Sequence, residues 1–174
     1  MSTVDRSSLA RQLEALARPI TDELGVTLYD VEVGGPGGIV KITVDSIDGH
    51  LPGNGITVDK VTGAAKQIGY ALEAEELIPY NYRLEVGSPG VERDLRQPWH
   101  FQAAVGQQVR VVLDVSATPG AEPVLTGTLS EATDTTATVT SGERAREFLL
   151  TDVRKARTVF DFGATPAQPS ANKR

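Results

Sequence analysis

The chain has 174 residues, of which 40% are hydrophobic and 23% charged, with no cysteine and a formal net charge of −6. This length suits one medium domain or two small ones, and because no run of about 18 apolar residues occurs, the composition predicts a soluble protein without a membrane span. The lack of cysteine excludes disulfides, a thiol nucleophile and cysteine-based metal sites, which fits a reducing cytoplasm. The N-terminal segment carries acidic residues and lacks the apolar run of a signal peptide, so export is not expected.

The net negative charge of the chain comes from its first part. Residues 1–96 carry 9 Lys/Arg and 15 Asp/Glu, a net charge of −6, whereas residues 97–174 carry 8 of each. A uniformly basic nucleic-acid surface is therefore excluded, and any contact with RNA has to be local. An acidic half can attract a basic partner, although acidity also serves solubility alone.

Apolar residues at helical spacing predict an amphipathic helix at the start of the chain. Its expected buried face consists of Leu9, Leu13, Leu16, Ile20 and Leu24. Pro19 lies inside this pattern and removes one helical hydrogen bond, which predicts a kink or a restart near Arg18. Gly25 is expected to end the helix.

Alternation of apolar and polar residues then predicts strands over 29–33 and 40–44, joined by the glycine-rich segment 34–38 as a hairpin with a flexible tip. After a loop at 46–55, Thr57 is placed to cap a second helix that ends near 77–79. The residues expected on its buried face are Val58, Val61, Ala65, Ile68 and Leu72. A third strand over 82–86 completes the order α-β-β-α-β, with both helices on one face of the sheet. The other face would carry the charged and polar residues Asp30, Glu32, Lys41, Thr43, Arg83 and Glu85.

After Phe101 the sequence predicts only short strands, at 109–113, 125–129, 137–139, 148–150 and 156–160. Five short strands, with Gly127 permitting a sharp bend and a helical turn at 151–153, are typical of a small SH3-like (Sm-like) β-barrel. The predicted fold is thus α+β, with an N-terminal α-β-β-α-β two-layer domain at 1–90, a linker at 91–97, a barrel at 98–162 and a disordered tail at 163–174.

The segment Leu84 to Leu95, LEVGSPGVERDL, joins the two predicted domains. Pro89 and Gly90 fit the central positions of a type II turn, because proline presets φ and glycine takes the positive φ. Backbone amides around the glycines, with Ser88 and Arg93 nearby, could form an anion-binding nest. A tight interdomain turn whose arginines pair with local acids explains the same residues equally well.

This run, followed by PWHF, resembles the signature of the RimP family of ribosome maturation factors. The residues that carry the resemblance are Leu84, Glu85, Val86, Ser88, Pro89, Gly90, Arg93, Leu95, His100 and Phe101. The segments LYDVEV, VKITVD, GITVD and GTL agree as well, so the resemblance covers residues 8 to 162. Two residues depart from the family pattern: Gly87 stands where serine is usual, and Asp94 where proline is common.

The resemblance implies a non-catalytic protein without cofactor or metal that assists maturation of the small (30S) ribosomal subunit. Its implied partners are the basic ribosomal protein S twelve and a region of 16S rRNA, and the chain is expected to be a cytoplasmic monomer in isolation. The motif and the basic cluster near the last strand supply the candidate partner-binding residues Ser88, Pro89, Gly90, Arg93, Arg96, Arg154, Lys155 and Arg157.

Two other function classes compete with this hypothesis. A stand-alone Sm-like RNA-binding regulator would bind free RNA strongly and in a salt-sensitive way, which an acidic chain disfavours. An enzyme with an anion pocket at 87–93 would need a convergent acid and base, and the sequence offers no such pair. His50 and His100 show no metal-ligand spacing and are expected to be structural.

Overall fold

The computed structural model describes residues 5–49, 54–114, 116 and 122–160. Contacts divide the chain into two units, residues 1–90 and 91–174. His50 and the tail predicted to be disordered, residues 163–174, lie outside the described residues.

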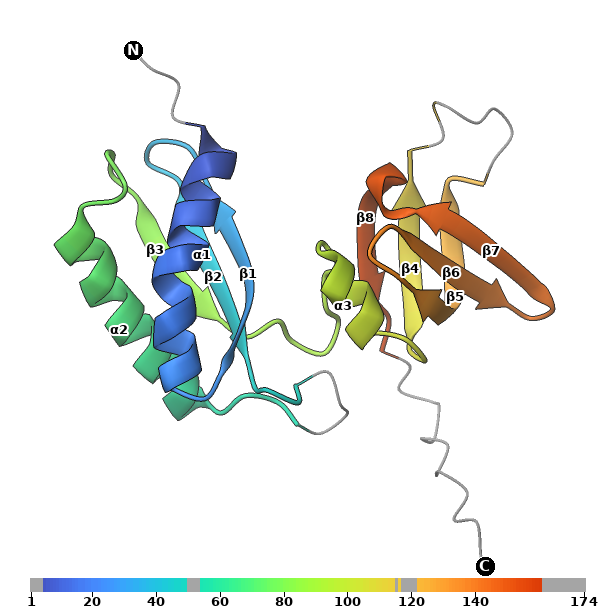
Figure 1. Ribbon diagram of the computed structural model, residues 1–174, viewed down its shortest axis with the longest axis horizontal. Helices are drawn as coiled ribbons and strands as arrows, with labels where there is room; N and C mark the ends of the chain where they lie inside the picture. The colour runs from blue at the N-terminus through green and yellow to red at the C-terminus, as the bar shows by residue number, and fades with distance from the viewer. Residues whose placement is uncertain (1–4, 50–53, 115, 117–121, 161–174) are drawn as a thin grey trace, which may run out of the picture. The chain divides into compact units, whose positions relative to one another are not determined.

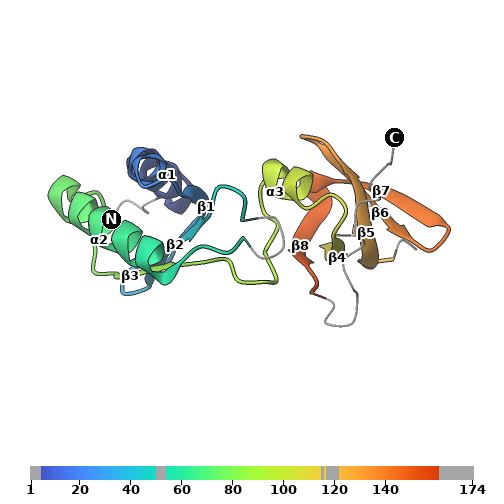
Figure 2. The ribbon, with the colours of Figure 1, turned by 90° about the horizontal axis from the view of Figure 1, so that it is seen from below.

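The N-terminal unit consists of two helices and a three-stranded sheet in the predicted order. Its elements are α1 (Arg6–Glu23), β1 (Thr27–Val33), β2 (Ile39–Asp45), α2 (Val58–Glu75) and β3 (Arg83–Gly87) (Figure 1). The strand order is β1-β2-β3, in which β1 and β2 are antiparallel and β2 and β3 are parallel. Both helices cover the same face of the sheet (Figure 2). The α-β-β-α-β two-layer prediction is therefore confirmed.

α1 runs as one helix through Pro19, so of the two expected alternatives the restart near Arg18 was wrong, and the kink stays a prediction. Pro19 has no N–H group to donate to the carbonyl group of Ala15. Both residues are exposed, so water can replace the missing hydrogen bond. The buried face is also shifted from the predicted one. Its fully buried residues are Leu9, Leu13, Ala17 and Thr21, while Leu16, Ile20 and Leu24 pack at its border.

α2 starts at the predicted cap, where the Thr57 hydroxyl accepts a hydrogen bond from the Lys60 amide at 3.4 Å. Its buried face is narrower than predicted and consists of Ala64, Ile68 and Leu72. Val58 was assigned to this face, but it lies in the first turn and is 79% exposed. The helix ends at Glu75, because Glu76 adopts a left-handed conformation with φ of 44°.

A β-bulge in β1 changes which residues face the helices. The register with β2 shifts between Leu28 and Asp30, so Tyr29 is the extra residue. Leu28 and Val31 therefore belong to the core under the helices. Tyr29 was expected there, but it is buried outside that core.

The hairpin tip at 34–38, expected to be flexible, forms hydrogen bonds with the segment that precedes β3. The Tyr80 hydroxyl donates to the Gly34 carbonyl at 2.9 Å, and the Gly37 amide donates to the Asn81 carbonyl at 2.7 Å. Gly37 has a φ of 73°, which glycine adopts without strain. The segment before β3 thus fixes the tip at one end of the sheet.

The C-terminal unit contains a short helix and a five-stranded antiparallel sheet. The elements are α3 (Pro98–Ala103), β4 (Gln108–Leu113), β5 (Val124–Ala132), β6 (Thr136–Ser141), β7 (Arg144–Leu149), the 3-10 turn η1 (Leu150–Asp152) and β8 (Val153–Thr158). The strand order is β7-β6-β5-β4-β8 (Figure 1). All five predicted strands are present, and the helical turn precedes the last one. Within the described residues no pairing joins β7 to β8, so the strand ladder does not close on itself.

One apolar core joins all five strands of this sheet to α3. It includes Phe101 from α3 together with Val109, Leu129, Phe148 and Ala156 from four of the strands. Gly127 lies in β5 where a Cβ atom would overlap the carbonyl group of Thr140 in the neighbouring strand. The glycine is needed for this close approach between two backbones.

Candidate functional site

The predicted motif is divided between the two units. Ser88, Pro89 and Gly90 belong to the N-terminal unit, and Arg93 and Arg96 to the C-terminal one. Gly90 has a φ of 74°, as the third position of a type II turn requires. The anion-binding nest that the sequence suggested would draw on residues of both units, and it stays a prediction.

From Arg93 onward, the segment predicted as a linker is bound to β8. The Thr158 amide donates to the Arg93 carbonyl at 2.9 Å, and the Leu95 amide donates to the Ala156 carbonyl at 2.8 Å. The Arg93 amide donates to the Thr158 hydroxyl at 2.8 Å. Leu95 is 2% exposed and belongs to the C-terminal core. Residues 93–95 therefore cover the free edge of β8 as part of the C-terminal unit.

His100 holds the start of α3 in place. Its Nδ1 atom accepts hydrogen bonds from the amides of Arg96 at 3.0 Å and Gln97 at 3.2 Å, and its side chain is buried. The rings of Trp99 and His100 form a T-shaped pair with a centroid distance of 4.2 Å. Two acceptor bonds to backbone amides require an unprotonated Nδ1 atom. The structural role expected for this histidine is confirmed by these contacts.

The three basic residues expected to act together near the last strand have different surroundings. Lys155 and Arg157 pair with Val112 and Arg110 of β4, whereas the register shift leaves Arg154 as the extra residue of a bulge. Arg157 forms an ion pair with Glu92 at 3.3 Å. Of the three residues, only Lys155 and Arg157 therefore have register partners in β4, and a joint role of the three in binding stays a prediction.

The positive charge of Arg154 influences the pKa of a nearby carboxyl group, that of Asp114. The pKa of Asp114 is lowered from its ordinary value mainly by hydrogen bonds from the Ser116 hydroxyl and amide, with a smaller contribution from the positive charge of Arg154. The positive charge of Arg154 thus has a minor effect on Asp114, and its candidate role in binding stays a prediction.

Arg110 is a basic residue that the sequence analysis did not select. It pairs directly with Arg157 across β4 and β8. Because side chains alternate between the two faces of a strand, Arg110 and Arg157 lie on the same outward face of the sheet. In sequence, Arg110 is a single cation 45 residues before Lys155. The alternation within the predicted strand 109–113 indicated that Arg110 is exposed. Only the pairing of β4 with β8 places it beside other cations.

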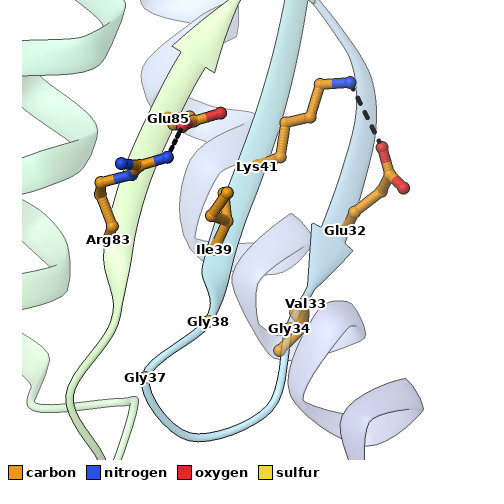
Figure 3. Close-up of a pocket in the computed structure, with 9 residues that line it drawn as sticks. All are labelled: Glu32, Val33, Gly34, Gly37, Gly38, Ile39, Lys41, Arg83 and Glu85. Carbon is orange, nitrogen blue, oxygen red and sulfur yellow. Dashed lines mark hydrogen bonds and ion pairs between the residues drawn. The ribbon is translucent and has the colours of Figure 1, made fainter.

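The helix-free face of the N-terminal sheet contains an open hollow of about 730 Å3. It lies beside the hairpin tip, with Ile39 between two ion pairs, Lys41 with Glu32 at 3.6 Å and Arg83 with Glu85 at 2.6 Å (Figure 3). In Figure 3 these side chains stand in front of the sheet and the helices lie behind it. The hollow therefore combines an apolar floor with charged walls.

The polar residues on this face of the sheet are exposed at one end and buried at the other. Lys41 is the register partner of both Glu32 and Glu85, so a lysine lies between two glutamates across the three strands. Further along β2, Thr43 is 6% exposed and Asp45 is 3% exposed. The prediction of a charged outer face is confirmed at the hairpin end, whereas the opposite end of β2 is covered.

The N-terminal unit accounts for the whole net negative charge of the protein. Residues 1–90 contain 7 Lys/Arg and 13 Asp/Glu, a net charge of −6, and residues 91–174 contain 10 of each. Among the described residues, no group of three or more His, Asp or Glu side chains lies together as metal ligands would. Within the same part of the chain, no helix has the length and apolar character needed to cross a membrane.

The fold defines a two-unit α+β protein with an acidic α-β-β-α-β unit followed by an antiparallel sheet unit. Residues 16–92 match the sequence profile of the RimP N-terminal domain. The N-terminal unit therefore resembles a RimP N-terminal domain over these residues, and the predicted resemblance to the RimP family is confirmed there.

Proposed function

We propose that this protein is a cytoplasmic maturation factor of the small (30S) ribosomal subunit that acts by binding and catalyses no reaction. The observation that carries the proposal is the RimP N-terminal domain at residues 16–92. The partners we propose are ribosomal protein S twelve and the 16S rRNA near it, bound by a monomer without cofactor.

The charge distribution supports a division of labour between the units. Ribosomal proteins that bind RNA are basic, so an acidic unit of net charge −6 attracts them and repels RNA. The neutral C-terminal unit lacks this repulsion and can approach RNA. Such a protein could hold a basic protein and the neighbouring RNA in one arrangement through binding energy alone.

The hollow on the N-terminal sheet is the surface we propose for the basic protein. Its carboxylates, Glu32 and Glu85, are 44% and 45% exposed in their side chains and can exchange their present lysine and arginine partners for those of another chain. Ile39 is 39% exposed and offers apolar contact between them. An extended segment with alternating basic and apolar residues would match this pattern.

We further propose that the C-terminal sheet forms an SH3-like barrel. Two observations support this: residues of all five strands share one apolar core, and the edge of β8 is covered by residues 93–95. The candidate partner-binding residues Ser88, Pro89, Gly90, Arg93, Arg96, Arg154, Lys155 and Arg157 remain part of the proposal.

Co-sedimentation of the purified protein with free small subunits, free large subunits and whole ribosomes tests the function. We expect binding to free small subunits that persists at moderate salt and is much weaker to the other two. Binding to any RNA at low salt that disappears at moderate salt would instead favour a stand-alone RNA-binding regulator. No binding to any ribosomal particle would refute the maturation-factor proposal.

A further inference from the structure

The register of the C-terminal sheet brings polar side chains of three strands to its outer face. β8 contributes Lys155 and Arg157, β4 contributes Gln108 and Arg110, and β5 contributes Thr126 and Thr128. Their register neighbours on the opposite side, such as Val109, Val111 and Ala156, are buried in the core. We call these six outward residues the basic sheet face.

The cations on the basic sheet face are close together. Arg110 and Arg157 are direct cross-strand partners, and such partners have Cβ atoms about 5 Å apart. Lys155 lies two residues before Arg157 on the same side of β8, a separation of about 7 Å. Like charges opposite each other reduce stability, so this arrangement needs a counter-charge.

The protein itself supplies only part of that counter-charge. Glu92 forms an ion pair with Arg157, and Asp94 is the bridge partner of Arg157 on the covering segment. Arg110 and Lys155 are exposed, and neither forms an ion pair with another described residue. Two positive charges on this face therefore remain available to an external anion.

The other side chains of the basic sheet face suit a phosphate backbone. The side-chain amide of Gln108 donates to the Thr128 hydroxyl oxygen at 2.9 Å, which leaves the hydroxyl hydrogen of Thr128 for another acceptor. Thr126 is the partner of Arg110 in β5 and adds a second exposed hydroxyl. No acid and no aromatic ring occupies the outward positions of β8, β4 and β5 within 108–112, 124–128 and 155–157. Phosphate contact is thus favoured over stacking on bases.

We infer that the basic sheet face binds ribosomal RNA through its phosphate groups, with Arg110 and Lys155 as the principal contacts. The inference rests on the proposed function and assigns the RNA contact to one surface of the C-terminal unit. It explains why the sequence tolerates two arginines opposite each other. Because phosphate contacts carry no base information, this face would position the protein on RNA of any sequence.

The test compares two double variants of the full chain in binding to purified free small subunits over a series of KCl concentrations. Arg110→Gln/Lys155→Gln removes the two free cations of the face. Lys66→Gln/Arg144→Gln removes two exposed cations from α2 and β7 and serves as the matched control. Each lost phosphate contact should lower the slope of log K against log salt by roughly 0.7–0.9. We therefore expect the first variant to bind about 20-fold more weakly at about 0.15 M salt, with a slope smaller by about 1.5.

The outcomes separate the inference from the function on which it rests. Equal binding by the wild-type chain and Arg110→Gln/Lys155→Gln would overturn the inference but leave the maturation-factor proposal intact. An equal loss in the control variant would also overturn it, because the effect would then come from overall charge. Failure of the wild-type chain to bind small subunits at any salt would refute both.

A photo-cross-linking residue introduced at Thr126 identifies the occupant of the face. The bound complex is irradiated, and the cross-linked product is digested with ribonuclease or with protease. A ribonuclease-sensitive product supports RNA on this face. A product that contains only ribosomal protein, or no product at all, overturns the assignment to RNA.

Discussion

Arg110 of β4 and Arg157 of β8 are direct partners across two antiparallel strands. Glu92, at 3.3 Å from Arg157, compensates one of the two positive charges. The other remains exposed next to it, although an uncharged residue at position 110 would fit the strand equally well. A residue that costs stability in the free protein and remains exposed is more simply explained by binding than by folding.

Arg110→Gln should therefore stabilise the free protein. Removal of a like-charge cross-strand pair is expected to raise the free energy of unfolding by about 0.2–1 kcal/mol. Urea unfolding at low ionic strength measures the change, and added salt should reduce it. Arg110→Lys keeps the charge and serves as the control. A loss of stability in Arg110→Gln that is absent in Arg110→Lys would show that the positive charge at this position helps the fold.

His100→Ala should destabilise the C-terminal unit by about 2–4 kcal/mol. The substitution leaves the amides of Arg96 and Gln97 without their acceptor and opens a cavity. In His100→Asn the side-chain oxygen lies near the position of Nδ1, so about half of this loss should be recovered. The chain has one tryptophan, Trp99, whose ring contacts His100, so its fluorescence reports unfolding at this site. Equal stability of the two variants would mean that packing outweighs the hydrogen bonds.

Gly127→Ala should destabilise the sheet, because its Cβ atom would overlap the backbone of Thr140, which cannot move aside as a side chain can. We expect a loss of about 2 kcal/mol or more in thermal or urea unfolding. Gly63→Ala in α2 is the contrasting variant, since no atom lies within 4 Å of its Cβ position. It should stabilise the N-terminal unit by about 0.5–1 kcal/mol. A neutral Gly127→Ala would mean that β5 and β6 can separate locally at little cost.

The sequence predicted the order of the elements well, because periodicity directly reports which residues face a core. Its errors arose where a local irregularity changes that face. Tyr29 follows the alternation of its strand, but a bulge between Leu28 and Asp30 moves it out of the core. Val58 fits the helical spacing of the buried residues, yet it is the first residue of α2 and its side chain is exposed.

The candidate site was harder to predict for a different reason. Arg154, Lys155 and Arg157 are close enough in sequence to suggest one basic cluster, but only Lys155 and Arg157 have register partners in β4. Arg110 is distant in sequence and joins Lys155 and Arg157 only through strand pairing. Register between strands depends on tertiary packing, which single residues and their spacing do not specify.

The hollow of the N-terminal sheet yields the last prediction. Glu32→Gln/Glu85→Gln removes both carboxylates beside Ile39 while keeping side-chain size. If a basic protein segment occupies the hollow, binding to small subunits should weaken by roughly three- to tenfold, mainly through slower association at low salt. Stability should change by less than about 1 kcal/mol per pair, because both ion pairs are exposed.

The matched control for this prediction is Glu73→Gln/Glu75→Gln, which removes two exposed carboxylates from the last turns of α2. It lowers the negative charge of the N-terminal unit by the same amount, at residues that do not line the hollow. A loss confined to Glu32→Gln/Glu85→Gln would locate the basic partner on the helix-free face. Equal losses in both variants would mean that the unit attracts its partner through its net charge of −6 as a whole and not through the hollow.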